Sequence, residues 1–214
     1  MPELRFTLIA DGSSDSTLLT VIKWLLDDVY PTIAVQRSFA DFRHLPKPPQ
    51  AGDIQARIDC ASQYYPFDIL IYHRDAESRD KGIVLQRKNE ILANLVDSEI
   101  VVCVIPVEMM EAWLLISGEA IKKAAGNRGY NKDMKLPAIQ AIEAVSNPKD
   151  LLHQILKQVS GLKGRRLNSF NVHQAVHLVA ENISDFSSLR QLNSFRVFEK
   201  DLREAVDKIV ANGN

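Results

Sequence analysis

Six acidic residues in the first half of the chain follow short apolar runs and could act together. They are Asp11 and Asp15 after the run at 6–10, Asp75 and Glu77 after the run at 67–72, and Glu108 and Glu111 after the run at 100–107. The last two are three residues apart, which would put them on one face of a helix. Clustered carboxylates raise one another's pKa, so proteins that gather them use the shifted proton or neutralise the charge with a cation. Hard oxygen ligands favour Mg²⁺ or Mn²⁺.

The apolar runs are predicted to be buried strands, because they are rich in β-branched and aromatic residues and too short for typical helices. A weaker strand is predicted at 33–37, and helical spacing of apolar residues predicts helices at 17–29, 53–64 and 83–96. This alternation indicates an α/β, Rossmann-like parallel sheet flanked by helices. The turns that follow its strands meet at the carboxyl edge, where ligands bind. The acidic residues are therefore expected to converge.

The second half of the chain is predicted to be mostly helical. The expected helices span 108–116, 135–145, 148–159, 172–183 and 194–210, and the expected surface loops are the glycine-rich stretches 126–131 and 161–166. Asn147 followed by Pro148 is a helix start signal. We expect an α/β core over 1–120 and a helical extension, packed on that core, over 121–214.

Composition limits the classes of function. The 26 basic and 27 acidic residues nearly cancel, so no global positive field would attract DNA or a membrane surface. No stretch approaches the roughly 20 apolar residues of a membrane span, and the two cysteines, Cys60 and Cys103, lack CxxC spacing. These features predict a cytoplasmic protein without a membrane partner. The P-loop and dinucleotide-binding glycine motifs are missing from the sequence, which argues against those nucleotide sites.

Each acidic residue also has a plainer interpretation. Asp11 and Asp15 could cap the following helix, and Asp75 and Glu77 could lie in a solvated loop. Glu108 or Glu111 could be a buried hydrogen-bonding acid or lie on an outer helix face. A histidine pair four residues apart, His173 and His177, lacks a third zinc ligand and is best interpreted as ordinary helix histidines.

With these residues in view, the first 120 or so residues resemble the Toprim-like fold of topoisomerases, primases and overcoming-lysogenization-defect nucleases. The chain looks closest to an uncharacterised bacterial Toprim-like family with an E-G-x-x-D turn, a D-x-D turn and an E-x-x-E-A-W helix. The matching segments here are 11–15 (DGSSD), 75–77 (DAE) and 108–113 (EMMEAW). An aspartate, Asp11, stands where that family has its first glutamate, and Glu77 stands where it has the second aspartate.

The resemblance implies a Mg²⁺-dependent nuclease or phosphotransfer domain, acting in bacterial defence with an ATPase partner. Asp11 or Asp15 would transfer the proton, and Asp75 and Glu77, with Glu108 and Glu111, would hold Mg²⁺ or Mn²⁺. The predicted nucleic-acid contacts are Arg74, Lys163, Arg165 and Arg166, with Arg43, His44 and Lys47 as further candidates. Two alternatives stay open: a non-catalytic interaction module that kept the fold, and a small-molecule phosphohydrolase.

Overall fold

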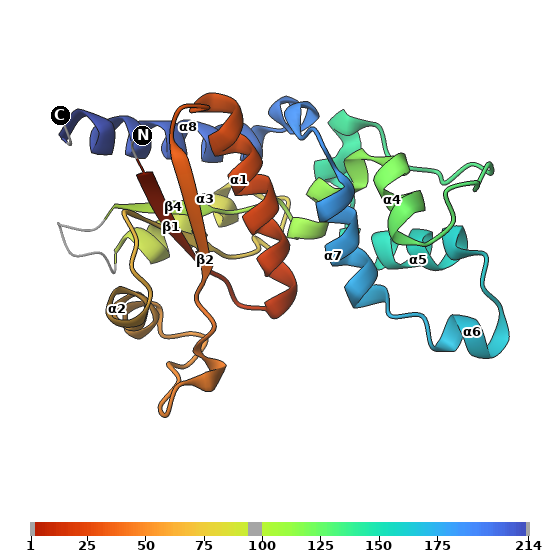
Figure 1. The fold of residues 1–214 in the computed structure, drawn as a ribbon, viewed down its shortest axis with the longest axis horizontal. Helices are drawn as coiled ribbons and strands as arrows, with labels where there is room; N and C mark the ends of the chain where they lie inside the picture. The colour runs from red at the N-terminus through yellow and green to blue at the C-terminus, as the bar shows by residue number, and fades with distance from the viewer. Residues whose placement is uncertain (1–2, 94–99, 213–214) are drawn as a thin grey trace.

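A parallel sheet forms the centre of one half of the molecule (Figure 1). The computed structural model describes residues 3–93 and 100–212. Within these residues, four strands lie in the order β2-β1-β3-β4, and all neighbouring pairs are parallel. The strands are β1 (Glu3–Ile9), β2 (Ala34–Phe39), β3 (Ile69–His73) and β4 (Val101–Val104). The α/β, Rossmann-like class predicted from the sequence is confirmed.

The central strand β3 is buried at every position. Its Tyr72 pairs with Ile9 of β1 on one side and with Cys103 of β4 on the other. Near-continuous apolar runs of this kind are typical of parallel strands that are covered on both faces. The ends of β1 and β3 therefore lie side by side at the carboxyl edge of the sheet.

Helices cover both faces of the sheet. They are α1 (Leu18–Val29) on one face, and α2 (Ile54–Tyr64) and α3 (Lys81–Leu92) on the other. Leu8 and Ile71 belong to the hydrophobic cluster that includes α1, whereas Leu70 and Tyr72 pack with Ile58 of α2. The helix predicted over 83–96 begins two residues earlier, where Asp80 accepts a hydrogen bond from the Gly82 N–H, and residues 94–96 lie outside the described ones.

The second half is helical, as predicted. Its elements are η3 (Met110–Ile116), α4 (Gly118–Ala124), η4 (Ile139–Ala144), α5 (Pro148–Ser160), α6 (Gly164–Asn168), α7 (Val172–Asn182), η5 (Ser187–Gln191) and α8 (Asn193–Asn212). The predicted start of α5 is confirmed, since the Asn147 side chain accepts a hydrogen bond from the Asp150 N–H and Pro148 opens the helix.

Several predicted boundaries were wrong. The strand predicted over 100–107 ends at Val104, shortly before Pro106, which has no N–H to donate. The helix predicted over 135–145 is limited to the 3₁₀ helix η4, and Lys135, which precedes it, adopts a left-handed backbone conformation. The loop predicted over 161–166 contains the start of α6, and α4 and η5 were not predicted.

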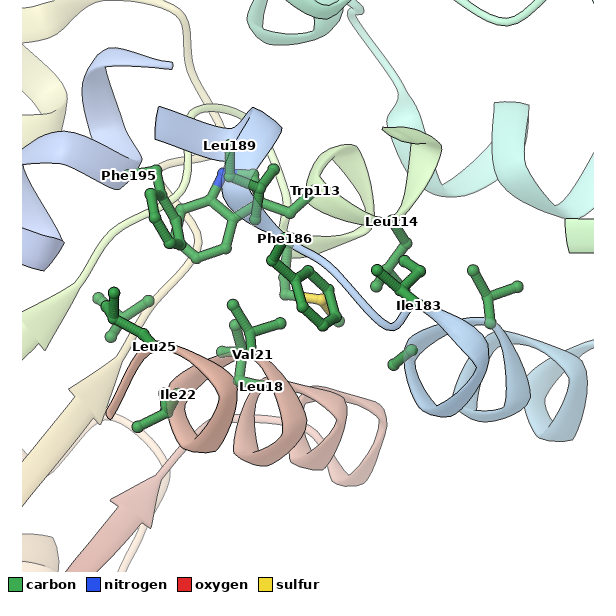
Figure 2. Close-up of a cluster of buried hydrophobic side chains, with 14 of the residues drawn as sticks. Leu18, Val21, Ile22, Leu25, Trp113, Leu114, Ile183, Phe186, Leu189 and Phe195 are labelled. Atoms are coloured by element: carbon green, nitrogen blue, oxygen red, sulfur yellow. The ribbon is translucent and has the colours of Figure 1, made fainter. Parts of the chain in front are cut away.

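One hydrophobic core joins the sheet to the helical half. Figure 2 shows Trp113 of η3 beside Leu189 and Phe195, with Phe186 between Trp113 and Val21 of α1. The rings of Trp113 and Phe195 meet edge to face, with 5.2 Å between their centroids. The same cluster extends from β1 to α8, so the predicted core over 1–120 and the predicted extension over 121–214 bury their apolar side chains together.

Among the helices of the described residues, none combines the length and the apolar composition needed to cross a membrane.

Candidate active site at the carboxyl edge of the sheet

Four of the six predicted acidic residues line one small cavity at the carboxyl edge of the sheet. Asp11 and Asp15 come from the turn after β1, and Asp75 and Glu77 come from the turn after β3. His73, Arg74 and Arg87 complete the wall of this cavity, whose volume is about 130 Å³. The sequence predicted that these four acids would meet. They do so because β1 and β3 are adjacent and parallel, so the turns after the two strands lie side by side.

Asp15 is buried and has a local structural role. Its carboxylate accepts hydrogen bonds from the Gly12 N–H at 2.9 Å and from the Ser14 hydroxyl at 3.2 Å. These bonds close the turn at the start of the 3₁₀ helix η1 (Ser13–Thr17). The capping interpretation of Asp15 is therefore correct for the turn, and the same carboxylate also faces the cavity.

Asp11 forms an ion pair with Arg57, a residue that the sequence did not single out. The Arg57 side chain is buried, whereas half of the Asp11 side chain is exposed. Arg57 comes from α2, donates a further hydrogen bond to the Ala10 carbonyl at 2.6 Å, and lies 5.6 Å from the centroid of the Tyr72 ring. Arg57 therefore fixes the turn after β1 to the helix layer beneath it.

Asp75 is the best-buried carboxylate after β3, and its charge is costly to keep there. Its Oδ1 accepts a hydrogen bond from the Met110 N–H at 2.9 Å. The pKa of Asp75 is raised to about 6, mainly by burial. The negative charges of Asp15 and Glu111 contribute to this rise, whereas His73 and the Met110 N–H oppose it. A carboxylate with this surrounding gains from a nearby cation.

His73 ends β3 beneath the carboxylates and is almost fully buried. Its Nδ1 lies 3.1 Å from the Val104 carbonyl, and because a carbonyl only accepts, Nδ1 carries a proton. The other ring nitrogen, Nε2, lies 3.5 Å from Asp75 Oδ1 and 3.8 Å from Asp15 Oδ2. His73 therefore sits directly between the two acidic turns.

The turns after β3 and β4 hold each other in a left-handed conformation. Glu77 and Glu108 have φ values of 52° and 59°. The Glu77 N–H donates to the Glu108 carbonyl at 2.9 Å, and the Glu108 N–H donates to the Ser78 carbonyl at 3.3 Å. Residues other than glycine rarely adopt this conformation, and such strain is common at functional sites.

The third predicted pair of acids does not share a helix face. Glu108 precedes η3 and its side chain forms an ion pair with Arg79 at 3.2 Å, so the predicted helix over 108–116 was wrong at its start. Glu111 lies within η3, where its nearly buried carboxylate is 3.6 Å from the Lys149 ammonium of α5. Neither carboxylate lines the cavity, although Glu111 acts on the pKa of Asp75.

Two arginines give the cavity a positive side. Arg74, a predicted contact, and Arg87 of α3 both donate to Glu90 Oε2, at 2.8 Å and 3.3 Å. The Arg87 Nε is buried and has no hydrogen-bond partner within residues 3–93 and 100–212. A buried N–H without an acceptor is costly to keep.

The other predicted basic residues lie elsewhere. Lys163, Arg165 and Arg166 are at α6, which Figure 1 shows at the end of the helical half farthest from the sheet. Arg43 pairs with Asp41 at 2.6 Å and lines a neighbouring cavity of about 380 Å³. Asp11 lines both this second cavity and the carboxylate cavity, so the two cavities adjoin.

The donor set fits a hard divalent cation in chemistry, since Asp15, Asp75 and Glu77 offer carboxylate oxygens around one cavity. The described residues contain no three His, Cys, Asp or Glu side chains already spaced to hold a metal ion. Of the three acids, Glu77 is the exposed one.

Comparison with protein-family models, with curated proteins and with solved structures gives no match. The resemblance to the Toprim-like family, the ATPase partner, the role in bacterial defence and the cytoplasmic location therefore stay predictions.

Proposed function

We propose that this protein is a Mg²⁺- or Mn²⁺-dependent phosphodiesterase that cleaves nucleic acid at the carboxylate cavity. One observation carries the proposal: acidic and basic groups suited to metal and phosphate line the same cavity. Asp15 and Asp75 supply the carboxylates, and Arg74 and Arg87 supply the guanidinium groups. Arg87 in particular has a buried N–H that lacks an acceptor within the part of the chain described.

Asp75, Asp15 and Glu77 would hold the metal. A bound Mg²⁺ or Mn²⁺ would polarise the phosphate and lower the pKa of a water molecule. Asp75 is suited to this role because burial and neighbouring negative charges raise its pKa to about 6, a cost that a cation would remove. The Met110 N–H donates a hydrogen bond to the Asp75 carboxylate and so fixes its position.

Arg74 and Arg87 would bind the phosphate that is attacked. A guanidinium group presents several N–H donors in one plane and matches phosphate oxygens. Glu90 contacts both groups and so fixes them relative to each other. We assign proton transfer to Asp11, because its side chain is half exposed to water and is held at the cavity by Arg57.

The neighbouring cavity supports an extended substrate over a small one. A volume of about 130 Å³ accommodates little more than a phosphate group, whereas the adjoining cavity of about 380 Å³ offers room for more of the chain. Arg43 at its wall could contact a further phosphate.

The test is an assay of labelled single-stranded DNA, double-stranded DNA and RNA with Mg²⁺, with Mn²⁺ and with a chelator. We expect metal-dependent cleavage that is lost in Asp75→Asn and retained in Asp59→Asn, which alters an exposed acid of α2 outside the cavity. Bis-nitrophenyl phosphate and nitrophenyl phosphate, assayed in parallel, distinguish a small-molecule phosphohydrolase. Equal cleavage by wild type and Asp75→Asn, or hydrolysis of the small esters alone, would refute the proposal.

One observation favours the second candidate, a non-catalytic interaction module. Asp11, Glu108 and Glu111 each pair with a basic residue of the same chain, namely Arg57, Arg79 and Lys149. An acid that is neutralised in this way does not need a metal. This candidate predicts that the wild-type chain binds neither Mg²⁺ nor Mn²⁺.

A further inference from the structure

A further cavity lies beside the edge strand β4, between α3 and α8. Its volume is about 320 Å³. Its apolar wall is formed by Val84 of α3, Ile105 and Val107 after β4, and Val197 and Phe198 of α8. Within the described residues, this cavity and the carboxylate cavity share no lining residue.

The cavity is open because two layers fail to meet. α3 packs with the cluster that contains Cys103 and Ile105, whereas Phe198 of α8 belongs to the cluster on the other face of the sheet. Beyond β4 no further strand fills the space between them in the described chain. Val197 is therefore 45% exposed, and Leu85 of α3 is 58% exposed, at the opening.

Polar contacts bound this cavity. Lys88 of α3 forms an ion pair with Asp201 of α8, which ties the two helices together across β4. Arg79 donates to the Ala144 carbonyl at 3.4 Å and pairs with Glu108. Because these contacts close the cavity on two sides, it fits a compact molecule better than a long peptide.

Three basic residues, Arg79, Lys81 and Lys88, line the rim of the cavity, together with the acid Glu143. Arg79 and Lys88 are already held in the ion pairs described above, so Lys81 carries the positive charge that remains. The Glu143 carboxylate is already engaged, because it accepts hydrogen bonds from the Ser194 N–H at 3.0 Å and from the Ser194 hydroxyl at 2.5 Å. Lys81 is exposed and forms no ion pair with the described residues, so its charge is available to an incoming anion.

We propose that this cavity binds a small amphipathic anion, with a compact apolar body against Val197 and Phe198 and its anionic group beside Lys81. Ligand pockets are usually apolar concavities of about 300–1,000 Å³ with a few polar groups that fix orientation. The size, the apolar wall and the single available charge of Lys81 meet this description together. The site is independent of the proposed phosphodiesterase activity.

The test is a fluorescence titration of the full chain with anilinonaphthalene sulfonate, and with phenylnaphthylamine, which has the same aromatic body without the sulfonate. We expect saturable binding of the sulfonate at one site. Lys81→Glu should weaken the sulfonate about fivefold and leave phenylnaphthylamine unchanged, because it reverses one exposed charge. A glutamate in the first turn of α3 is compatible with the helix.

Val197→Asp should weaken both probes at least about tenfold, because it places a charge on the apolar wall. Val210→Asp, on the same helix but outside the cavity, and Lys123→Glu, on α4, are the matched controls and should change neither affinity. Circular dichroism checks that each variant is folded. Sulfonate binding that is not saturable, that survives Val197→Asp, or that responds to Lys81→Glu no more than phenylnaphthylamine does would overturn the proposal.

Discussion

At the scale of single residues, the Asp75 carboxylate is mostly buried at the cavity. It lies between the buried His73 ring, the Met110 N–H and the neighbouring charge of Asp15. Its pKa is raised to about 6, mainly by burial. This pKa makes the stability of the protein depend on pH in a defined direction.

Asp75→Asn should stabilise the metal-free protein at neutral pH. The pKa of Asp75 rises from 3.8 to about 6 on folding, so its contribution to stability is present below the lower value and is lost as the pH rises through the higher one. Asparagine does not ionise, so above about pH 7 the variant should be more stable by on the order of 1–2 kcal/mol, allowing for the partial exposure of the site. The difference should vanish toward about pH 4. Urea denaturation across this range measures it, and a variant that is less stable at every pH would contradict the assignment.

Arg87→Lys should weaken substrate binding while leaving metal binding intact. Lysine keeps the positive charge but removes the buried Nε–H that lacks an acceptor among the described residues. We expect KM for the cleaved substrate to rise about tenfold with a smaller change in kcat, because a planar charge-assisted contact to phosphate is lost. Steady-state kinetics, with Mn²⁺ affinity as the control, check this. An unchanged KM would show that Arg87 does not contact substrate.

The sequence predicted the acidic part of this site and missed most of the rest. Asp11, Asp15, Asp75 and Glu77 follow strands directly, and the meeting of parallel strand ends depends only on the order of elements. Arg57 and Arg87 come from α2 and α3, and their contacts depend on the rotation of each helix against the sheet. An arginine within a helix gives no local signal that it faces inward.

At the scale of elements, backbone hydrogen bonds between the turns after β3 and β4 stabilise the left-handed residues in both turns. The bond from the Glu77 N–H to the Glu108 carbonyl joins two left-handed residues. The strain was not predictable, because the sequence offers glutamate where the conformation favours glycine. It also explains why the helix predicted at 108 begins only at Met110.

Glu108→Gly should be more stable than Glu108→Ala. Both variants lose the partly exposed ion pair with Arg79, but only glycine relieves the left-handed conformation. We expect a difference of about 1 kcal/mol in the free energy of unfolding. Thermal or urea denaturation of the two variants side by side measures it. An alanine variant that is as stable as the glycine variant would show that the turn carries no such strain.

Predictability differed among the elements for a physical reason. The strands and the α5 start were found because burial on two faces and an Asn-Pro cap leave local patterns. The 3₁₀ helices η3 and η4 were predicted as ordinary helices, since their apolar spacing resembles that of an α-helix over one or two turns. Trp113 of η3 is buried, and tertiary packing of this kind is not visible in a local pattern.

At the scale of the whole molecule, the sheet and the helical half should unfold as one unit. Trp113 of η3 packs on Phe195 and Phe198 near α1, so the same side chain supports both halves. Trp113→Ala should cost about 3–5 kcal/mol. Leu178→Ala, at a partly exposed position of α7, is the control and should cost much less.

Two probes follow the transition in different places. Circular dichroism reports all helices. Tryptophan fluorescence reports Trp24 and Trp113 in wild type, and in Trp113→Ala it reports only Trp24 of α1, whose ring centroid lies 5.7 Å from that of Phe186. The two curves should coincide in wild type and in Trp113→Ala. Separate transitions would show that the halves are independent domains, as a boundary near residue 120 would allow.

The central claim is that the carboxylate cavity holds a divalent metal through Asp75, and calorimetric titration of Mn²⁺ and Mg²⁺ tests it most directly. The titration compares wild type, Asp75→Asn and the exposed-acid control Asp59→Asn. We expect binding to wild type and to the control, and loss of binding in Asp75→Asn. If wild type binds neither metal, or if Asp75→Asn binds as tightly as wild type, the metal-dependent account of this site is wrong.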